Sequence, residues 1–379
     1  MIRELSELES SDWYPFHMPG HKRQAVEREN WVDTVYRHDI TEIDGFDDLR
    51  SPEGMIRDIE IRLAGMYRSK QAYLSVNGST CCNLSAISAL VPVNGRLMMD
   101  KEAHVSVYNA AVLNRLDSVF LNRKILADND LTACISPDEI KEKLLICRRE
   151  DRMPDAVLIT SPTYEGFTAD VDQIADIVHE YEIPLIVDGA HGAHFDADNN
   201  KSMFPGLSLK ADVTIVSLHK TLPALTQVSA LLVNGDNVKP YTIKQYINMF
   251  QTTSPSYILM ASAERCLQIM ERDGAELKSK LHEELDLLYS LSKSLNRLRF
   301  TGPEYIGKYG IHAFDLSKIN IMDVKGGMTG QELYDIFRKE YHLQPERAGK
   351  RTCLMLTSVM DSKEGFRRLM EAVKEIDKR

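Results

Sequence analysis

Two apolar runs that each end abruptly at a polar side chain constrain the fold of this chain more than any other feature. Residues 213–216 lead through Ser, Leu and His to Lys220, and residues 185–187 lead directly to Asp188. Runs that are apolar at nearly every position are typical of parallel strands covered on both faces, and open α/β sheets bind ligands beyond the carboxyl ends of their strands. We therefore expect Lys220 and Asp188 to lie together at one edge of a buried sheet.

An amine and an acid at such an edge suit a flat heterocyclic cofactor. A desolvated lysine can form a Schiff base with a carbonyl, although a single lysine after a strand is more often an ordinary surface residue. Pyridoxal phosphate needs an amine for its aldehyde, an acid beside its ring nitrogen and donors for its phosphate. An aspartate about 4 Å from the ring nitrogen favours the protonated ring by on the order of 4 kcal/mol at an intermediate effective dielectric. Asp188 and Lys220 together therefore predict this cofactor.

A polar turn between a strand pattern and a helix pattern offers a site for the phosphate. The strand-like residues 72–76 are followed by Asn-Gly and then by Ser79 and Thr80, and helical periodicity resumes over residues 83–90. Backbone N–H groups at a helix N-terminus lack intrahelical partners, so both residues would offer amides and hydroxyls to an anion. Ser and Thr serve equally well as plain N-caps, and both interpretations stay open at this point.

Strand and helix patterns alternate along most of the chain. Strand-like segments occur at residues 72–76, 95–100, 119–121, 156–160, 185–188, 213–216 and 229–233. With helical periodicity between most of them, they predict a parallel, doubly wound sheet whose last strand is antiparallel. A long helix over residues 258–298 with a break at Gly274 comes next. The remaining sequence predicts a small α+β unit, with strands near 311–314 and 352–357 and helices near 330–338 and 363–376.

Composition argues against several classes of protein. A chain of 379 residues exceeds one typical core, which favours two unequal domains. The formal net charge of -10 argues against a nucleic-acid surface. No segment approaches about 18 consecutive uncharged apolar residues, so no membrane span is expected. The 6 cysteines form no CxxC pair, as expected of reduced thiols in a cytoplasmic enzyme.

Two histidine pairs have the spacing of metal ligands, but their surroundings argue against a metal. A Pro-Gly pair breaks the helix that would place His17 and His21 on one face, and two glycines lie beside His191 in the segment that ends at His194. We therefore expect no metal site. For the segment around His17, two interpretations stay open: an ordered arm near the active site and a solvent-exposed N-terminal loop.

Taken in order, the polar segments of this chain resemble those of the bacterial ornithine/lysine/arginine decarboxylases. The matching segments are residues 16–22, 77–80, 104–106, 161–166, 188–194, 217–227 and 252–257. The resemblance implies a three-layer large domain with a mainly parallel sheet and the aspartate-aminotransferase-like fold (fold type I), a small α+β C-terminal domain, and pyridoxal phosphate as cofactor. We expect an N-terminal arm over residues 1–50, the cofactor-binding domain over 51–257, and a linking helix with the small domain over 258–379.

The resemblance also implies roles for single residues. Lys220 would bind the cofactor aldehyde, Asp188 would pair with the ring nitrogen and His104 would stack on the ring. The residues implied to hold the phosphate are Ser79, Thr80, Ser217 and His219 of the same chain, and Thr253 and Ser254 of a second subunit. Those implied to lie around the ring are Ala190, His191 and, near its phenolic oxygen, Thr163. Because such sites form between subunits, a homodimer is expected.

The activity implied is decarboxylation of a basic amino acid (lysine, ornithine or arginine) to a polyamine-type amine and carbon dioxide. His219 or Lys220 is the expected proton donor. An aminotransferase would clamp the substrate carboxylate with arginine, which opposes its loss. We therefore expect that neither Arg347 nor Arg351 of the small domain binds the α-carboxylate.

Two rival functions remain open. One is an aminotransferase or another pyridoxal-phosphate lyase, and the other is a non-catalytic pyridoxal-phosphate-binding paralogue. The presence of Lys220, Asp188 and His104 together favours an enzyme. The acids considered for the distal cation of the substrate are Glu165, Asp47 and Glu346. Typical members of the family continue past the small domain into a further domain that contributes to the substrate entrance, whereas this sequence ends at Arg379. The identity of the substrate and turnover itself therefore stay open.

Overall fold

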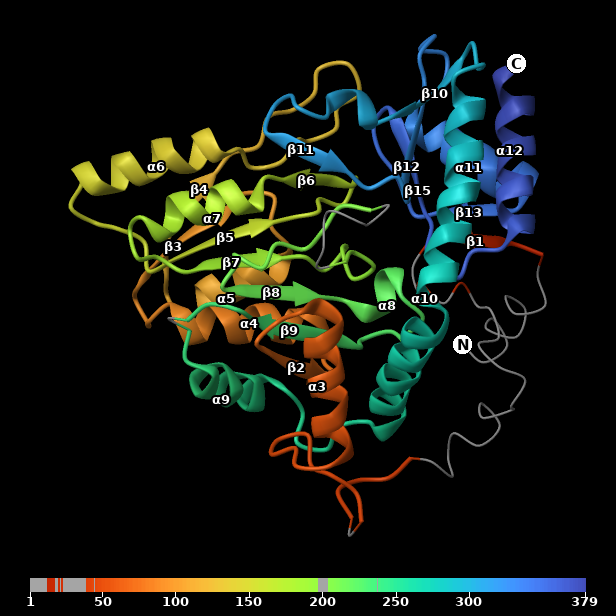
Figure 1. The fold of residues 1–379 in the computed structure, drawn as a ribbon. Helices are drawn as coiled ribbons and strands as arrows, with labels where there is room; N and C mark the ends of the chain where they lie inside the picture. The colour runs from red at the N-terminus through yellow and green to blue at the C-terminus, as the bar shows by residue number, and fades with distance from the viewer. Residues whose placement is uncertain are drawn as a thin grey trace.

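The computed structural model describes residues 12–17, 20, 22, 39–43, 45–196, 204–236 and 238–379. Its centre is a seven-stranded sheet in the order β2-β9-β8-β7-β5-β3-β4 (Figure 1). The strands are β2 (Gln71–Ser75), β3 (Arg96–Asp100), β4 (Asp117–Leu121), β5 (Ala156–Thr160), β7 (Leu185–Asp188), β8 (Val213–Val216) and β9 (Ser229–Val233). β9 runs in the direction opposite to that of the other strands of this sheet, as the sequence predicted.

Alternating side chains of each strand enter different cores, because successive residues point to opposite faces. On β3, Leu97 and Met99 join the core on one face and Met98 joins the core on the other. The first face is covered by α4 (Gly78–Leu90), α5 (Val105–Leu113) and α9 (Pro240–Phe250). The second is covered by α3 (Met55–Tyr67), α6 (Pro137–Arg149) and α7 (Val171–His179). These three layers confirm the predicted fold class of the large domain.

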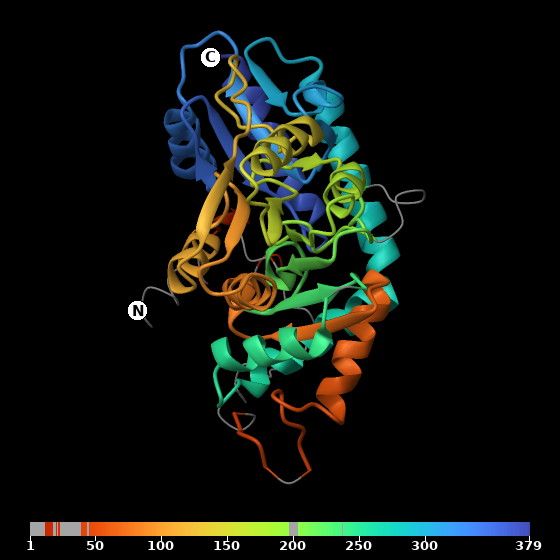
Figure 2. The same cartoon turned by 90° about the vertical axis from the view of Figure 1, so that its left-hand side faces the viewer.

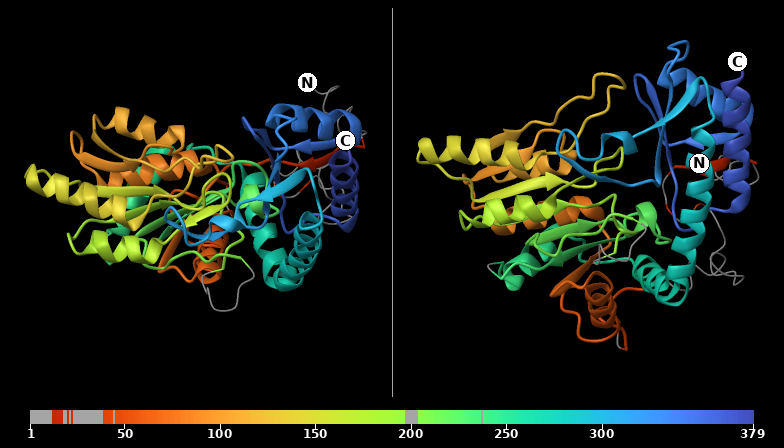
Figure 3. Two further views of the ribbon diagram at one scale, coloured as in Figure 1. Left: turned by 90° about the horizontal axis from the view of Figure 1, so that it is seen from above. Right: turned by 45° about the horizontal axis from the view of Figure 1, so that its top comes forward.

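The small domain is built on a four-stranded antiparallel sheet in the order β10-β12-β15-β14. Its strands are β10 (Leu298–Thr301), β12 (Lys318–Asp323), β14 (Arg347–Ala348) and β15 (Thr352–Leu356). The helices α11 (Gly330–Tyr341) and α12 (Lys363–Asp377) belong to the same unit, and the 3-10 turn η2 (Pro303–Tyr305) follows β10. Figure 3 shows this unit beside the carboxyl edge of the large sheet.

Two short pairings connect distant parts of the chain. β1 (Tyr14–Phe16) pairs in parallel with β13 (Leu343–Pro345), so an N-terminal segment is part of the small domain. β6 (Phe167–Ala169) pairs with β11 (Ile311–Phe314), which ties the loop after β5 to the small domain. In Figure 2 the C-terminal elements lie at one end of the molecule, and α3 and α9 lie at the other.

The predicted break at Gly274 is wrong. The helix α10 (Tyr257–Ser292) runs through this position without interruption, and it ends before Leu298, where β10 begins. Gly274 is buried, and a Cβ there would lie 3.0 Å from the Met270 methyl group, so the small residue serves packing. Among the described residues, no helix is both long and apolar enough to cross a membrane.

Gly20 of the N-terminal segment lies against the residues that follow β8 at the edge of the large sheet. The Gly20 N–H donates to the His219 carbonyl oxygen (2.7 Å), and a Cβ at Gly20 would lie 2.8 Å from the Leu222 carbonyl oxygen. Lys22 is buried, and its Nζ donates to the His17 carbonyl oxygen (3.0 Å). The sequence left open whether this segment is an ordered arm or a solvent-exposed loop. Gly20 and Lys22 fit an ordered arm, and His21 lies outside the described residues.

Candidate active site

Lys220 and Asp188 lie at the carboxyl ends of neighbouring parallel strands. β7 ends at Asp188, which is in register with Ile215 of β8, and Lys220 follows β8 on the single-turn helix α8 (Leu218–Thr221). Burial lowers the pKa of Lys220; the Asp188 carboxylate opposes this shift, and the positive charge of Lys318 adds to it. The amine is therefore more readily deprotonated than that of a surface lysine.

A hydrogen-bonded chain holds Asp188 in place and leads to His104. Asn83 Nδ2 donates to Asp188 Oδ2 (2.9 Å), and the Ala190 N–H donates to Oδ1 (3.1 Å). Asn83 Nδ2 also donates to Ser106 Oγ (3.0 Å), which lies 2.9 Å from His104 Nδ1. Because the Ser106 backbone N–H donates to the same ring nitrogen (3.2 Å), His104 Nδ1 is an acceptor.

Sequence reasoning missed Asn83 and Ser106. The available signal was a polar amide in the apolar helix α4, where a buried Asn requires a partner.

The predicted phosphate residues gather at the N-terminus of α4. Ser79 and Thr80 lie in its first turn, while Asn77 occupies the N-cap position without a capping side-chain hydrogen bond. Ser79 and Thr80 are therefore not plain N-caps. Ser79 Oγ lies 2.6 Å from Ser217 Oγ, and His219 Nδ1 donates to the Val228 carbonyl oxygen (2.9 Å). Two hydroxyls and a helix N-terminus thus converge as an anion site would require.

These groups line one cavity of about 570 Å³. The predicted site residues that line it are Ser79, Thr80, His104, Asp188, Ala190, His191, Ser217, His219 and Lys220. Three others do not. Thr163 Oγ1 instead accepts a hydrogen bond from the Phe167 N–H (3.2 Å). Thr253 and Ser254 are exposed and do not line the cavity. The neighbouring Thr252 N–H donates to Asn77 (3.2 Å).

His191 connects Lys220 to an aromatic ring. Its Nε2 lies 3.0 Å from Lys220 Nζ, and its ring meets the Tyr164 ring edge-on at 4.8 Å between centroids. Burial lowers the pKa of His191 well below its usual range, and nearby cations such as Lys220 and Lys318 lower it further. His194 lies 3.3 Å from Asp315 instead, so the two histidines do not converge. The described residues contain no cluster of three or more candidate metal ligands.

The two arginines expected not to bind the α-carboxylate, and the acids considered for the distal cation of the substrate, have different neighbours. Arg347 Nη2 lies 2.6 Å from Glu165 Oε1, and both residues line the cavity. Arg351 donates to the Asp128 carbonyl oxygen outside the cavity lining. Glu346 accepts a hydrogen bond from the Tyr164 hydroxyl group. The Asp47 carboxylate accepts backbone N–H groups at the start of α3 instead of facing the cavity.

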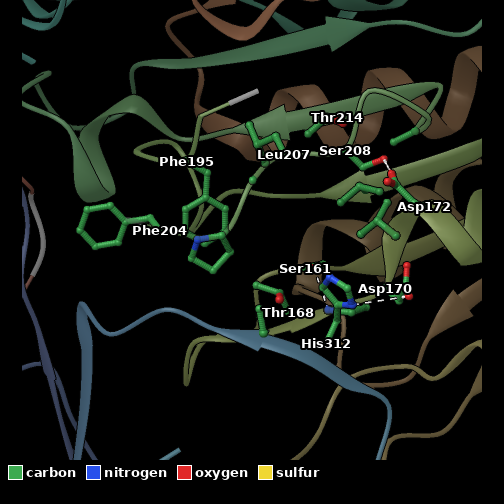
Figure 4. Close-up of a pocket in the computed structure, with 17 residues that line it drawn as sticks. Ser161, Thr168, Asp170, Asp172, Phe195, Phe204, Leu207, Ser208, Thr214 and His312 are labelled. Carbon is green, nitrogen blue, oxygen red and sulfur yellow. Dashed lines mark hydrogen bonds and ion pairs between the residues drawn. The ribbon is translucent and has the colours of Figure 1, made fainter. Parts of the chain in front are cut away.

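A second cavity of about 260 Å³ lies elsewhere, between the sheet and the segment that follows residue 203 (Figure 4). Its labelled lining includes Thr168, Thr214, Phe195 and Phe204, and His312 lies 3.5 Å from Asp170 at its side. None of the predicted site residues lines it, whereas most of them line the cavity of about 570 Å³.

A family model described as the major domain of ornithine/lysine/arginine decarboxylases matches residues 1–345. The chain belongs to this family. Among curated relatives of this decarboxylase family, the arginine decarboxylase of Bacillus cereus is 27% identical over 95% of this chain and 78% of its own length. The arginine decarboxylase of Bacillus subtilis is 26% identical over 95% of this chain and 74% of its own length.

Solved structures of the family share the fold. A lysine decarboxylase of Francisella novicida has a TM-score of 0.77 at 18% identity, over 97% of this chain and 58% of that chain. The constitutive lysine decarboxylase of E. coli has a TM-score of 0.69 at 20% identity, over 86% of this chain and 52% of that one. The chain thus spans somewhat more than half the length of these solved decarboxylases. The predicted fold class and the predicted family, which is a family of pyridoxal-phosphate-dependent decarboxylases, are both confirmed.

Proposed function

We propose that this protein decarboxylates a basic amino acid with the help of pyridoxal phosphate. The observation that carries the proposal is the convergence of Lys220, Asp188, His104 and the Ser79–Ser217 hydroxyl pair on one cavity of about 570 Å³. An amine of lowered pKa, a fixed carboxylate and a helix N-terminus fit the aldehyde, the ring nitrogen and the phosphate of this cofactor. Relatives named arginine and lysine decarboxylases support the substrate class.

Each residue has a distinct part in the proposed reaction. When bound, the cofactor accepts the electron pair that is released as carbon dioxide leaves the substrate. Asp188, held by Asn83 and Ala190, keeps the ring nitrogen protonated. His104 would cover the ring, and the neutral His191 imidazole lies beside the Lys220 amine without adding positive charge. Lys220 or His219 returns a proton to the substrate carbon.

The contacts of the two arginines favour decarboxylation over transamination. Arg347 is paired with Glu165, and Arg351 is bound to a backbone carbonyl outside the cavity lining. Arg351 is therefore not placed as a clamp for a carboxylate that must lose its solvation before it leaves, and Arg347 has a carboxylate partner within the protein.

A homodimer and a cytoplasmic location complete the proposal. Thr253 and Ser254 are exposed in one chain, as residues that serve a neighbouring subunit's phosphate would be. Exposed apolar side chains such as Val112 on α5 and Met249 on α9, two helices that pack on α4, support a subunit interface on this side. The domain boundaries near residues 50 and 257 stay part of the proposal.

The deciding experiment measures carbon dioxide released from lysine, ornithine and arginine by the cofactor-loaded protein, alongside its visible absorbance. We expect release from at least one of them, and we expect Lys220→Ala to lose both turnover and covalently attached cofactor. Transfer of the amino group to a keto acid without carbon dioxide release would favour an aminotransferase. Normal absorbance without any turnover would favour the non-catalytic paralogue.

A further inference from the structure

The cavity contains a guanidinium site that the chain fills with its own arginine. The Arg347 guanidinium lies over the Tyr164 ring, with Cζ 4.7 Å from the ring centroid, and its Nη2 lies 2.6 Å from Glu165 Oε1. A planar cation stacked on an aromatic face and paired with a carboxylate is a strong arrangement for guanidinium recognition. Tyr164 and Glu165 thus present the two surfaces that a guanidinium needs.

The two halves of this contact differ in how firmly they are held. The Glu165 side chain is 11% exposed, whereas that of Arg347 is 44% exposed. The Glu165 backbone carbonyl accepts a hydrogen bond from Asn320 (2.9 Å), and the Tyr164 hydroxyl donates to Glu346. Arg347 belongs to the two-residue edge strand β14 and reaches the site through a long side chain. The acid and the ring are therefore fixed, and the arginine is the part that can be exchanged.

The site lies close to the amine that defines the reaction centre. Lys220 Nζ contacts His191 at 3.0 Å, and the His191 ring contacts Tyr164. A substrate whose α-amino group lies near Lys220 would extend its side chain past His191 towards Tyr164 and Glu165. Of the other carboxylates among the described lining residues, Asp188 is held by Asn83 and Ala190, which leaves Glu102 as the competing partner for a cation.

We propose that Tyr164 and Glu165 bind the distal guanidinium of a guanidino amino acid substrate, and that Arg347 occupies this site until the substrate displaces it. The inference rests on the proposed decarboxylation and narrows its substrate class. An ammonium group can pair with Glu165 but lacks the planar face that stacks on Tyr164, so a substrate ending in an amine binds less tightly.

The exchange predicts opposite effects for the two partners. Arg347→Met removes the internal competitor, so a guanidinium ligand binds more tightly, because affinity rises when a larger fraction of the protein is ready to bind. Glu165→Gln removes the charge partner, and we expect a guanidinium ligand to bind on the order of tenfold more weakly. A structural role for Arg347 predicts weaker binding in both variants.

The test titrates cofactor-loaded protein with a guanidinoalkylamine and with a diaminoalkane of equal length, by calorimetry. We expect the wild type to prefer the guanidinium ligand, Arg347→Met to raise that affinity, and Glu165→Gln to abolish the preference. Glu102→Gln is the matched control, since Glu102 lines the same cavity. Loss of the preference in Glu102→Gln but not in Glu165→Gln, or weaker guanidinium binding by Arg347→Met, overturns the proposal.

Two further readouts separate the possible failures. Cofactor absorbance and thermal unfolding of each variant report whether it has folded, and the gain in affinity expected for Arg347→Met cannot arise from misfolding. If guanidinium binding depends on Glu165 but no basic amino acid releases carbon dioxide, the proposed reaction alone would be refuted. Carbon dioxide release with no role for Glu165 in binding would refute this inference alone.

Discussion

At the scale of single residues, the strand-end residues were predictable and their supporting partners were not. Lys220 and Asp188 stand out because a run that is apolar at nearly every position precedes each one, and parallel strands bring their carboxyl ends together. Asn83 depends on contacts with Asp188 and Ser106, which are distant in the sequence. The pairing of Glu165 with Arg347 joins residues 182 positions apart, which no local pattern reveals. The sequence therefore indicates which residues carry the chemistry, but it does not reveal the distant partners that position them.

His191 makes the stability of the protein depend on pH. Burial lowers the pKa of His191 well below its usual value of about 6.5, and neighbouring cations lower it further. Above about pH 6.5 the imidazole is neutral in both the folded and the unfolded state, so the free energy of unfolding does not depend on pH through His191 there. As the pH falls below that value, the unfolded chain binds a proton that the folded protein does not bind, which costs about 1.4 kcal/mol per pH unit.

We expect the stability advantage of the wild type over His191→Asn to shrink as the solution is acidified. The difference in unfolding free energy should fall by about 1.4 kcal/mol between about pH 6 and about pH 5, and it should be constant between about pH 7 and about pH 8. Urea unfolding at each pH measures it. A difference that is constant across the acidic range would show that His191 is protonated in the folded protein.

At the scale of elements, the start of α3 explains the role of Asp47, an acid that sequence reasoning considered for the distal cation of the substrate. The Asp47 carboxylate accepts backbone N–H groups of Glu53, Gly54, Ile56 and Arg57 at the N-terminus of α3. These groups have no intrahelical partners, and a negative charge there also complements the helix dipole. Asp47 therefore stabilises α3, which packs on β2.

We expect Asp47→Ala to lower the free energy of unfolding by about 1–2 kcal/mol, because it leaves the first turn of α3 uncapped. The midpoint of urea unfolding measures the change. Asp48→Ala is the matched control, since the Asp48 carboxylate accepts only the exposed Arg50 N–H among the hydrogen bonds described for it. Equal losses in the two variants would contradict the capping role.

The strands of the large sheet were predictable, whereas several other elements were not. α9 buries only Ile243 and Ile247 among its described residues, which is too weak an apolar stripe to signal a helix. β12 is buried along its whole length although it contains Lys318, Asn320 and Asp323. Distant residues pair with two of these side chains: Asn320 donates to the Glu165 carbonyl oxygen (2.9 Å), and Arg297 pairs with Asp323 at 2.9 Å. Burial of polar residues by distant partners hides a strand from sequence patterns.

At the scale of the whole molecule, the active-site cavity is shared between two units. The large sheet supplies Lys220 and Asp188, and the small domain supplies Arg347. The loop that carries Tyr164 and Glu165 is held between them, because Asn320 of β12 donates to the Glu165 carbonyl oxygen. In the proposed function, the position of the small domain would therefore affect substrate binding directly.

The proposed homodimer makes a prediction about the α5 side of the molecule. Val112 is 77% exposed there, and a lysine at this position would place a charge in an apolar interface. We expect Val112→Lys to shift the protein from dimer to monomer in analytical ultracentrifugation at micromolar concentration. Leu287→Lys on α10, where the leucine is 57% exposed, is the control and should remain dimeric. A wild-type protein that sediments as a monomer would remove the basis for the shared site.

The parallel pairing of Tyr14–Phe16 with Leu343–Pro345 sets an order of events during synthesis. The first of these strands leaves the ribosome more than three hundred residues before its partner exists, which is roughly half a minute at about ten residues per second. Throughout that time the strand has no partner to pair with. The nascent chain therefore carries this strand unpaired until Leu343–Pro345 has been synthesised, and the small domain can close only after that point.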